Sequence, residues 1–332
     1  MTEPKPPGKL FLVGLGPGGR EHMTGRAREA IAAADTLIGH ATYLRLVADL
    51  VGDQQVVKSG MTEEVERARL AVELAQAGRT VALISSGDSG VYGMAGLTFE
   101  VLFQSGWTPE TGFPVEVVPG ATALTSCAAL VGAPLSHDFC AISLSDLLTP
   151  WPVIARRLNA AAAADFVCAL YNPKSGRRTR QLQEAQRLFL CHRRPDTPVA
   201  LVHAAFRPRQ RVELTTLAAL DGCEIGMLTT VLIGNSQTQV RHGLLITPRG
   251  YTNKYDLAGG TTVAGERAGT SLSSGLDAWL AAIRASAEGV EQLAARYQLP
   301  ARYIAELLDA PDAAATEADI DLLRSPRADV RH

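Results

Sequence analysis

The chain has 332 residues, of which 46% are apolar and 20% are charged. At roughly 150 residues per domain, this length suggests about two domains. Lys and Arg together number 32 and Asp and Glu 34, so the formal net charge is −2. This balance argues against a chain built mainly to wrap nucleic acid, and the apolar content excludes a disordered chain.

The sequence carries no signal for membrane insertion, secretion or a structural metal. No apolar run reaches the roughly 18–20 residues of a membrane span, and the segment 1–8 (MTEPKPPG) lacks the apolar region of a secretory signal. The five cysteines lie at least 13 residues apart, with no metal-binding spacing. We therefore expect a cytoplasmic protein with reduced thiols, no membrane or nucleic-acid partner and no bound metal.

The first half of the chain alternates short apolar runs with helical patterns. Helices are predicted over 24–34, 62–76 and 122–130, with Thr24 and Thr62 as N-caps of the first two. The predicted strands are 10–13, 36–38, 80–84 and 115–118. Strand, glycine turn and helix in repeated succession predict an open, mostly parallel α/β sheet in an N-terminal domain, 1–148.

Two prolines in the segment 146–152 (DLLTPWP) mark the predicted boundary to a second α/β domain, 149–250, with more hairpin character. Its predicted helices are 153–163 and 177–190, and its predicted strands are 166–170, 199–202, 210–214 (an edge strand), 230–233 and 243–246. The remainder, 251–332, is predicted to be a Gly/Thr/Ser-rich linker and a small helical extension with helices at 276–285, 290–297, 302–308 and 318–323. Residues 293–308 fit a helix-turn-helix or a plain helical hairpin, and the single base of the second helix, Arg302, favours the hairpin.

Five glycine-rich or polar breaks follow predicted strands. The first, GLGPGG, fits a dinucleotide fingerprint, but Pro17 removes a backbone N–H and no acidic residue ends a strand about 20 residues later. Each break also has a purely structural interpretation, such as helix capping by Asp88 or Thr122. Strand ends from both halves can nevertheless converge on one cleft between two domains. The breaks are 14–19 (GLGPGG), 85–93 (SSGDSGVYG), 118–123 (VPGATA), 170–174 (LYNPK) and 229–235 (TTVLIGN).

In this order and at these spacings, the five motifs resemble those of the class III S-adenosylmethionine-dependent tetrapyrrole methyltransferases, over roughly residues 9–250. Ser89 stands where that family usually has Pro. The segments LYNPKSGRR, GMTEE, AAFRPRQ and TTVLIGN are similar to the branch that methylates precorrin-3B at C-17. The resemblance implies two α/β domains with an interdomain cofactor cleft, the tetrapyrrole methylase fold, and a homodimer.

The activity implied is C-methylation of precorrin-3B with contraction of the ring, giving precorrin-4 in cobalamin synthesis. The same step on cobalt-factor III of the anaerobic route, and a non-catalytic precorrin-binding protein, remain alternatives. Hand-over of the unstable intermediate to other enzymes of the pathway would involve the helical extension. The S-adenosylmethionine site implied by the resemblance comprises Pro17, Gly87, Asp88, Val91, Tyr92, Thr122, Ala123, Tyr171, Asn172, Ala205, Thr230 and Val231.

The chemistry sets different demands for the two steps. Methyl transfer needs alignment and water exclusion more than a strong base, whereas ring contraction needs general acid–base groups. Candidates for the latter are Asp88, Glu63 and Asp146, with His22 and His137 as further options, and each also fits a capping or solvated role. Because precorrins carry several carboxylates, which Arg binds bidentately, substrate contacts are predicted at Arg177, Arg178 and Arg207.

Overall fold

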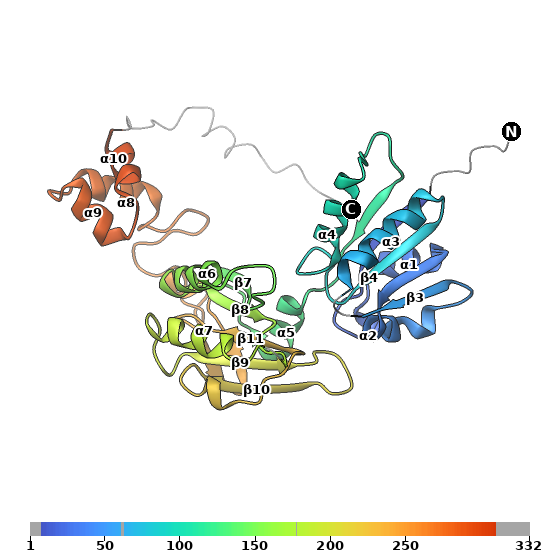
Figure 1. The fold of residues 1–332 in the computed structure, drawn as a ribbon. Helices are drawn as coiled ribbons and strands as arrows, with labels where there is room; N and C mark the ends of the chain where they lie inside the picture. The colour runs from blue at the N-terminus through green and yellow to red at the C-terminus, as the bar shows by residue number, and fades with distance from the viewer. Residues whose placement is uncertain (1–7, 61–62, 177, 310–332) are drawn as a thin grey trace. The chain divides into compact units, whose positions relative to one another are not determined.

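The computed structural model describes residues 8–60, 63–176 and 178–309. The chain divides into two compact units, Met1–Arg249 and Gly250–His332 (Figure 1). Among the described residues, no helix has the length and apolar character that crossing a bilayer requires. The predicted α/β class is confirmed in the larger unit, which contains two five-stranded sheets.

The first sheet is entirely parallel, with strand order β3-β2-β4-β1-β5. Buried apolar side chains alternate between its two faces. Helix α1 packs on one face, and α3 and α4 pack on the other. The elements are β1 (Lys9–Gly14), α1 (Gly25–Ala33), β2 (Thr36–His40), α2 (Ala41–Leu44), β3 (Gln55–Ser59), α3 (Glu64–Gln76), β4 (Thr80–Ser85), α4 (Met94–Gln104) and β5 (Val115–Val118).

The second sheet has the order β10-β9-β11-β8-β7 and is mixed. Strand β7 is parallel to β8, whereas the pairs β8–β11, β11–β9 and β9–β10 are antiparallel, in agreement with the predicted hairpin character. Helices α6 and α7 cover one face. Its elements are β7 (Phe139–Ser143), α6 (Trp151–Ala163), β8 (Val167–Tyr171), α7 (Gln181–Leu190), β9 (Pro198–His203), β10 (Arg211–Thr216) and β11 (Thr229–Ile233).

The change from the first sheet to the second comes earlier than the predicted boundary after residue 148. Helix α5 (Ala123–Val131) directly follows the last strand of the first sheet, yet Leu124 and Cys127 pack with Ala200 and Leu232 of the second sheet. Strand β7 also belongs to the second sheet. The prolines of the segment 146–152 therefore mark the start of α6 and not the start of the second sheet.

Three short strands form a further sheet, in the order β12-β13-β6, from β6 (Gly132–Ala133), β12 (Gln239–Arg241) and β13 (Leu244–Ile246). The smaller unit has its own apolar core, in which Ile283, Leu293 and Ile304 are buried. Its described helices are α8 (Leu276–Arg284), α9 (Val290–Tyr297) and α10 (Ala301–Asp309). The helix predicted at 318–323 lies outside the described residues.

One local prediction about helix ends is confirmed, and others differ from the structure. Thr24 caps α1 as predicted, and its hydroxyl accepts a hydrogen bond from Ala27 N. The N-cap of α3 is Glu63, and Thr62, which was predicted to cap it, lies outside the described residues. Helix α7 begins at Gln181 instead of residue 177, and the sequence analysis missed α4.

Candidate functional site

A pocket opens within the larger unit where strands of both five-stranded sheets end. Its lining includes every residue of the predicted cofactor set except Val231. Thr230 and Val231 are neighbours on β11, so their side chains point to opposite faces; Val231 packs in the core beneath α6 and α7. The lining also includes residues that the sequence analysis did not assign to the cofactor site: Tyr43, Ser86, Cys127, Ala204, Arg207, Met227, Leu228 and Thr229.

Close backbone packing joins the loops at one wall of the pocket. Gly16 and Gly87 exchange two hydrogen bonds, with N–O distances of 2.8 and 2.9 Å. Gly87 has a φ of +67°, which favours glycine. A Cβ atom at Gly120 would lie 2.2 Å from the Gly87 carbonyl oxygen, so only glycine fits there. The glycines therefore let the loops after β1, β4 and β5 meet through their backbones.

Asp88 ties two of these loops together. One carboxylate oxygen accepts a hydrogen bond from Gly90 N at 2.8 Å, and the other accepts one from Gly120 N at 3.0 Å. The first bond lies within its own loop, and the second crosses to the loop after β5. Of the three predicted acid–base residues, only Asp88 lines the pocket, and the structure gives it a role in holding the loops.

The N-terminus of α5 is capped by a residue from the second sheet. Thr122 occupies the N-cap position, but its side chain does not bond the helix. The Tyr171 hydroxyl instead accepts a hydrogen bond from Leu124 N at 2.7 Å and lies 2.6 Å from the Thr122 hydroxyl. The Tyr171 ring centroid is 5.0 Å from that of Tyr92. This contact joins the loop after β4 to the end of β8.

Asn172 continues this wall in an unusual backbone conformation. Its φ is +52°, and two other lining residues, Tyr92 and Ala204, also have positive φ values, of 54° and 47°. Such conformations are costly for non-glycine residues and occur most often at functional sites. The Asn172 side chain donates to the Ser143 hydroxyl at 3.0 Å, and Arg178 Nε donates to the Asn172 carbonyl at 3.0 Å. Arg178 thus supports the pocket wall from outside the lining.

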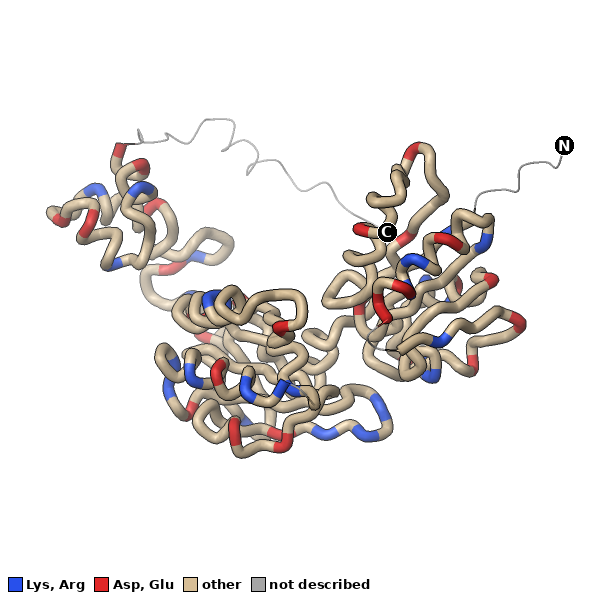
Figure 2. The backbone as a smooth tube through the Cα atoms, in the orientation of Figure 1, with Lys and Arg blue, Asp and Glu red and all other residues tan. Residues whose placement is uncertain are grey.

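Arg207 spans the pocket from the loop between β9 and β10. Its Nε donates to the Pro17 carbonyl and its Nη2 to the Ser86 hydroxyl, each at 2.7 Å. Figure 2 shows several basic residues along this loop and the start of β10. Within the described ranges, no carboxylate forms an ion pair with Arg207. The sequence analysis predicted Arg207 as a substrate contact, and the structure places it in the pocket lining.

Burial sets the protonation of the pocket's phenols and thiol. It raises the pKa values of Tyr43, Tyr92 and Tyr171, and it raises the pKa of Cys127 to about 11. These four groups are therefore protonated at neutral pH. Burial lowers the pKa of the Arg207 guanidinium.

The other predicted acid–base and substrate residues that the structure describes lie outside the pocket lining. Glu63 accepts a hydrogen bond from Gly60 N at 2.7 Å, and Asp146 accepts one from Gln181 Nε2 at 2.8 Å. His22 packs against the Phe206 ring, and His137 Nδ1 accepts from Asp138 N. Arg177 lies outside the described residues. Between residues 8 and 309, excluding the gaps in the description, no group of three or more His, Cys, Asp or Glu is placed to hold a metal ion.

The residues that the sequence analysis missed fall into two kinds. Ser86, Ala204 and Thr229 lie within motifs or segments that the sequence singles out but were not assigned to the cofactor site. Met227 and Leu228 directly precede the motif 229–235, so a wider boundary would have included them. Tyr43 and Cys127 lie on helices and carry no motif signal. Cys127 is nevertheless four residues after Ala123, and this helical spacing places both on one face of α5.

The composition of the pocket suits a nucleoside that carries a sulfonium group. Small residues leave space beside the Tyr92 and Tyr171 rings, which offer aromatic surface. The hydroxyls of Thr122, Thr229 and Thr230 offer hydrogen bonds, and Asp88 adds a negative charge to the lining. The residues present therefore fit S-adenosylmethionine.

Comparisons with known proteins agree with this assignment. Residues 9–221 match the family model of the tetrapyrrole (corrin/porphyrin) methylases. The chain is 59% identical over 250 residues to a cobalt-factor III methyltransferase of Priestia megaterium; the alignment covers 75% of this chain but 46% of that protein. The chain therefore spans less than half the length of this relative.

Two other relatives are matched over almost their whole length. A probable cobalt-factor III C(17)-methyltransferase of Salmonella typhimurium is 49% identical over 243 residues, which cover 73% of this chain and 99% of that protein. A precorrin-3B C(17)-methyltransferase of Sinorhizobium is 44% identical over 251 residues, which cover 74% and 97%.

Solved structures with the same fold include two methyltransferases. The methyltransferase CobJ has a TM-score of 0.66 and 34% identity, with 73% of this chain and 99% of that chain covered. A uroporphyrin-III C-methyltransferase from Thermus thermophilus, in complex with S-adenosylhomocysteine, has a TM-score of 0.56 and 28% identity, with 68% and 97% covered.

Proposed function

Since the chain belongs to the tetrapyrrole (corrin/porphyrin) methylase family, we propose that it is an S-adenosylmethionine-dependent methyltransferase acting on C-17 of a cobalamin precursor, with contraction of the macrocycle. The observation that carries the proposal is one pocket to which all five motifs contribute residues. The first four contribute the loops after β1, β4, β5 and β8, whereas the fifth contributes Thr229 and Thr230 at the start of β11 and not the turn that follows it. Two relatives whose names specify C(17) methylation support the position of the transfer.

We propose that the pocket lining holds the cofactor through Gly87, Asp88, Thr122, Tyr171 and Thr230, together with the other lining residues of the predicted set. When bound, the cofactor supplies an electrophilic methyl group. The similar structure of a uroporphyrin-III C-methyltransferase in complex with S-adenosylhomocysteine supports this choice of ligand. Calorimetric titration with S-adenosylhomocysteine should give saturable binding, and NAD should give none. Tight NAD binding without S-adenosylhomocysteine binding would overturn the cofactor assignment.

The protein's part in methyl transfer is alignment and exclusion of water. The joined loops fix one wall of the pocket, and the Tyr171–α5 contact fixes another. The phenols are protonated at neutral pH, and burial raises their pKa values further, so they do not act as bases. In-line transfer to an electron-rich ring carbon needs this preorganisation more than it needs a base.

Two substrates follow from the proposal, precorrin-3B and its cobalt-containing counterpart, cobalt-factor III. The motif resemblance favours precorrin-3B, with precorrin-4 as product. The relatives with 59% and 49% identity are both named for cobalt-factor III, which favours the cobalt form. Mass spectrometry of the products from metal-free and cobalt-loaded substrates would identify the one that gains a methyl group. A chain that binds both but methylates neither would be a precorrin-binding protein.

The proposal also includes a homodimer in the cytoplasm. All five cysteines are free thiols, as a reducing compartment requires. Sedimentation equilibrium of the full chain should give twice the mass of one chain, which is 35.2 kDa. A concentration-independent monomer would contradict the dimer and leave the methyltransferase assignment untouched.

A further inference from the structure

Arg67 is a buried cation that has no hydrogen-bond or ion-pair partner among the described residues. It lies in the first turn of α3, and only 4% of its surface is exposed. Its Nε has no hydrogen-bond partner, and its guanidinium makes no hydrogen bond or ion pair with any residue that the structure describes. Burying an unpaired charge is costly, so proteins rarely retain one without a compensating contact.

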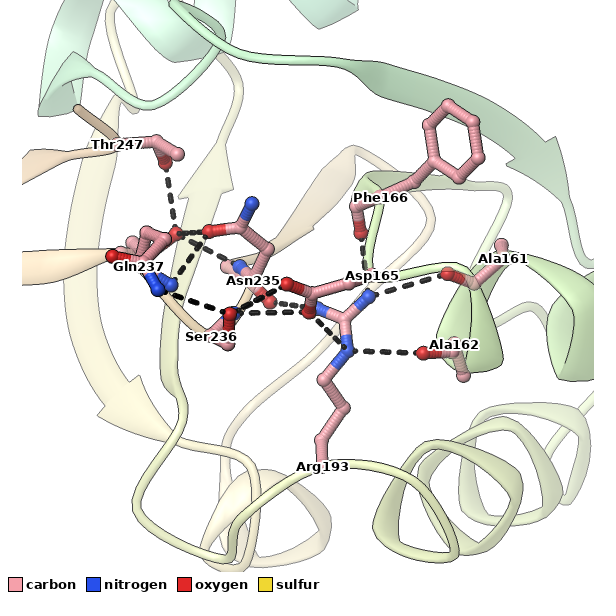
Figure 3. A network of polar contacts seen from close by, with 11 residues as sticks. Ala161, Ala162, Asp165, Phe166, Arg193, Asn235, Ser236, Gln237 and Thr247 are labelled. Atoms are coloured by element: carbon pink, nitrogen blue, oxygen red, sulfur yellow. Dashed lines mark hydrogen bonds and ion pairs between the residues drawn. The ribbon is translucent and has the colours of Figure 1, made fainter. Parts of the chain in front are cut away.

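A second buried arginine of this chain shows what a structural role looks like. Arg193 is 6% exposed, and its guanidinium donates to the carbonyls of Ala161, Ala162, Phe166 and Gly234. It also forms an ion pair with Asp165 at 3.3 Å (Figure 3). The two residues are about equally buried. The Arg193 guanidinium has four carbonyl acceptors and one carboxylate partner, whereas the Arg67 guanidinium has no acceptor among the described residues. Arg67 therefore lacks the contacts that a purely structural buried arginine makes.

The surroundings of Arg67 connect it to the pocket. Because α3 directly follows β3 in a parallel sheet, its first turn, which contains Arg67, lies at the edge of the sheet where β2 ends and α2 begins. Tyr43 of α2 lines the pocket at this edge. In agreement with this placement, the charge of Arg67 opposes the rise that burial causes in the pKa of Tyr43. Arg207, which also lines the pocket, acts on the same Tyr43 hydroxyl. The carboxylate of Glu64, in the same turn of α3 as Arg67, is exposed. Two arginines, neither of which forms an ion pair with a described carboxylate, thus act on the pKa of one phenol.

We propose that Arg67, Tyr43 and Arg207 form a carboxylate-binding subsite beside the cofactor pocket, in which Arg67 is the buried cation that a ligand carboxylate completes. This inference rests on the proposed function, since both the tetrapyrrole substrate and the cofactor carry carboxylates. A guanidinium pair with a phenolic donor is the donor set that a planar carboxylate prefers. The substrate is the source that we favour, because its several acidic side chains need cations beyond the cofactor site.

The test uses the full chain and the substitution Arg67→Met, which keeps an aliphatic stem and removes the charge. Without ligand, the variant should melt about 2–4 °C higher than the parent, because an uncompensated buried charge has been removed. Its affinity for uroporphyrin, a porphyrin polycarboxylate, should fall on the order of 30-fold. Arg69→Met is the matched control: Arg69 lies on the same helix, is exposed and pairs with Glu73. It should change neither quantity.

Calorimetry with two ligands distinguishes the source of the carboxylate. Loss of uroporphyrin affinity with S-adenosylhomocysteine affinity retained would support a substrate subsite. The reverse would support a subsite for the cofactor's carboxylate. Unchanged affinity for both, or a variant that melts lower or fails to fold, would overturn the inference. Because these measurements need no turnover, they stand even if methylation of C-17 is not observed.

Discussion

Asp88 illustrates how one side chain can serve the cofactor pocket without touching a reacting atom. Both of its carboxylate oxygens accept backbone N–H groups, one from each of two loops. From the sequence, this residue is predicted to be a cofactor contact, a catalytic group or a helix cap. The structure favours a further role, in which the carboxylate cross-links the loops after β4 and β5.

We expect Asp88→Asn to weaken this cross-link. An amide can accept with its oxygen, but its NH₂ group would face a second N–H donor. The free energy of unfolding should fall by about 0.5–1.5 kcal/mol, the net value of one hydrogen bond, because the two N–H donors are exposed or half-buried. Affinity for S-adenosylhomocysteine should fall roughly tenfold, which corresponds to 1.4 kcal/mol.

Denaturant unfolding and calorimetry of Asp88→Asn would measure both effects. Asp53→Asn, at an exposed position of the same sheet's loops, is the control and should match the parent. Unchanged cofactor affinity in a folded Asp88→Asn variant would show that the cross-link is not needed for binding.

The elements that the sequence predicts well are the buried ones. Residues of β1, β2, β4 and β11 are almost all buried, so each appears as a short apolar run. Strand β3 was missed because polar residues at its exposed and half-exposed positions leave only two apolar residues in a row. Strand β7 was also missed, although its first four residues (FCAI) are apolar. The pairing of α5 with the second sheet was also missed, since chain order suggested that it would cover the first.

Prediction of the pocket from the sequence was limited in the same way, because local patterns do not record tertiary packing. Its motifs were predictable because strand ends and glycine turns have sequence signals. The burial of Arg67 was not predictable, because an Arg in a charged helical segment such as ERARLAVE is usually expected on the solvent-exposed face of the helix. Burial of that arginine depends on how α3 packs on its sheet, which no local pattern records.

Arg193 links elements of the second sheet and should dominate its stability. Its guanidinium binds the last carbonyls of α6, the residue before β8 and the residue after β11. Arg193→Met would leave these carbonyls and Asp165 without their shared donor. We expect a loss of about 3–5 kcal/mol in the free energy of unfolding, as for other broken buried charge networks.

Arg194→Met provides a matched comparison for Arg193→Met. Arg194 is the next residue in the chain, but it is exposed and pairs only with Asp196. The expected change is within about 0.5 kcal/mol, because exposed ion pairs contribute little. Equal destabilisation by the two substitutions, measured by urea unfolding, would contradict the role assigned to Arg193.

Glu116 links three elements of the first sheet and gives it a pH dependence. Its carboxylate on β5 binds Arg26 of α1 at 2.6 and 2.8 Å and Lys9 of β1 at 2.9 Å. Hydrogen bonds from Arg26 and Lys9 lower the pKa of Glu116 from 4.5 to about 2. A lowered carboxyl pKa stabilises the folded state fully above about pH 4.5, and this contribution is lost as the pH falls toward 2.

We therefore expect Glu116→Gln to cost on the order of 1 kcal/mol at pH 7, a value typical of a partly exposed ion-pair network. The difference from the parent should shrink steadily between pH 4.5 and pH 2, where the parent carboxyl takes up its proton. Urea midpoints measured across this range provide the check. A difference that is constant with pH would mean that the pairs do not stabilise the fold.

At the scale of the whole molecule, the two units have separate cores and different relations to the family. The family match, 9–221, lies within the larger unit, Met1–Arg249, which also contains the complete pocket lining. The Salmonella relative is covered to 99% by 243 aligned residues, so a protein about as long as the larger unit exists in the family by itself. The smaller unit packs its own core from α8, α9 and α10.

These facts predict that the smaller unit is dispensable for the chemistry. A chain ending at Arg249 should fold, because the described core clusters of the larger unit contain no residue beyond that point. Its affinity for S-adenosylhomocysteine and its kcat/KM for methylation should stay within about twofold of the full chain, equivalent to a few tenths of a kcal/mol. Calorimetry and single-enzyme turnover of the two chains would measure this directly.

If the shorter chain folds and binds the cofactor but no longer methylates, the helices must contribute to substrate binding or to the reaction itself. Retained turnover would leave the smaller unit free for a task outside catalysis, such as hand-over of the product to another enzyme, which assays with a coupled downstream enzyme could then address.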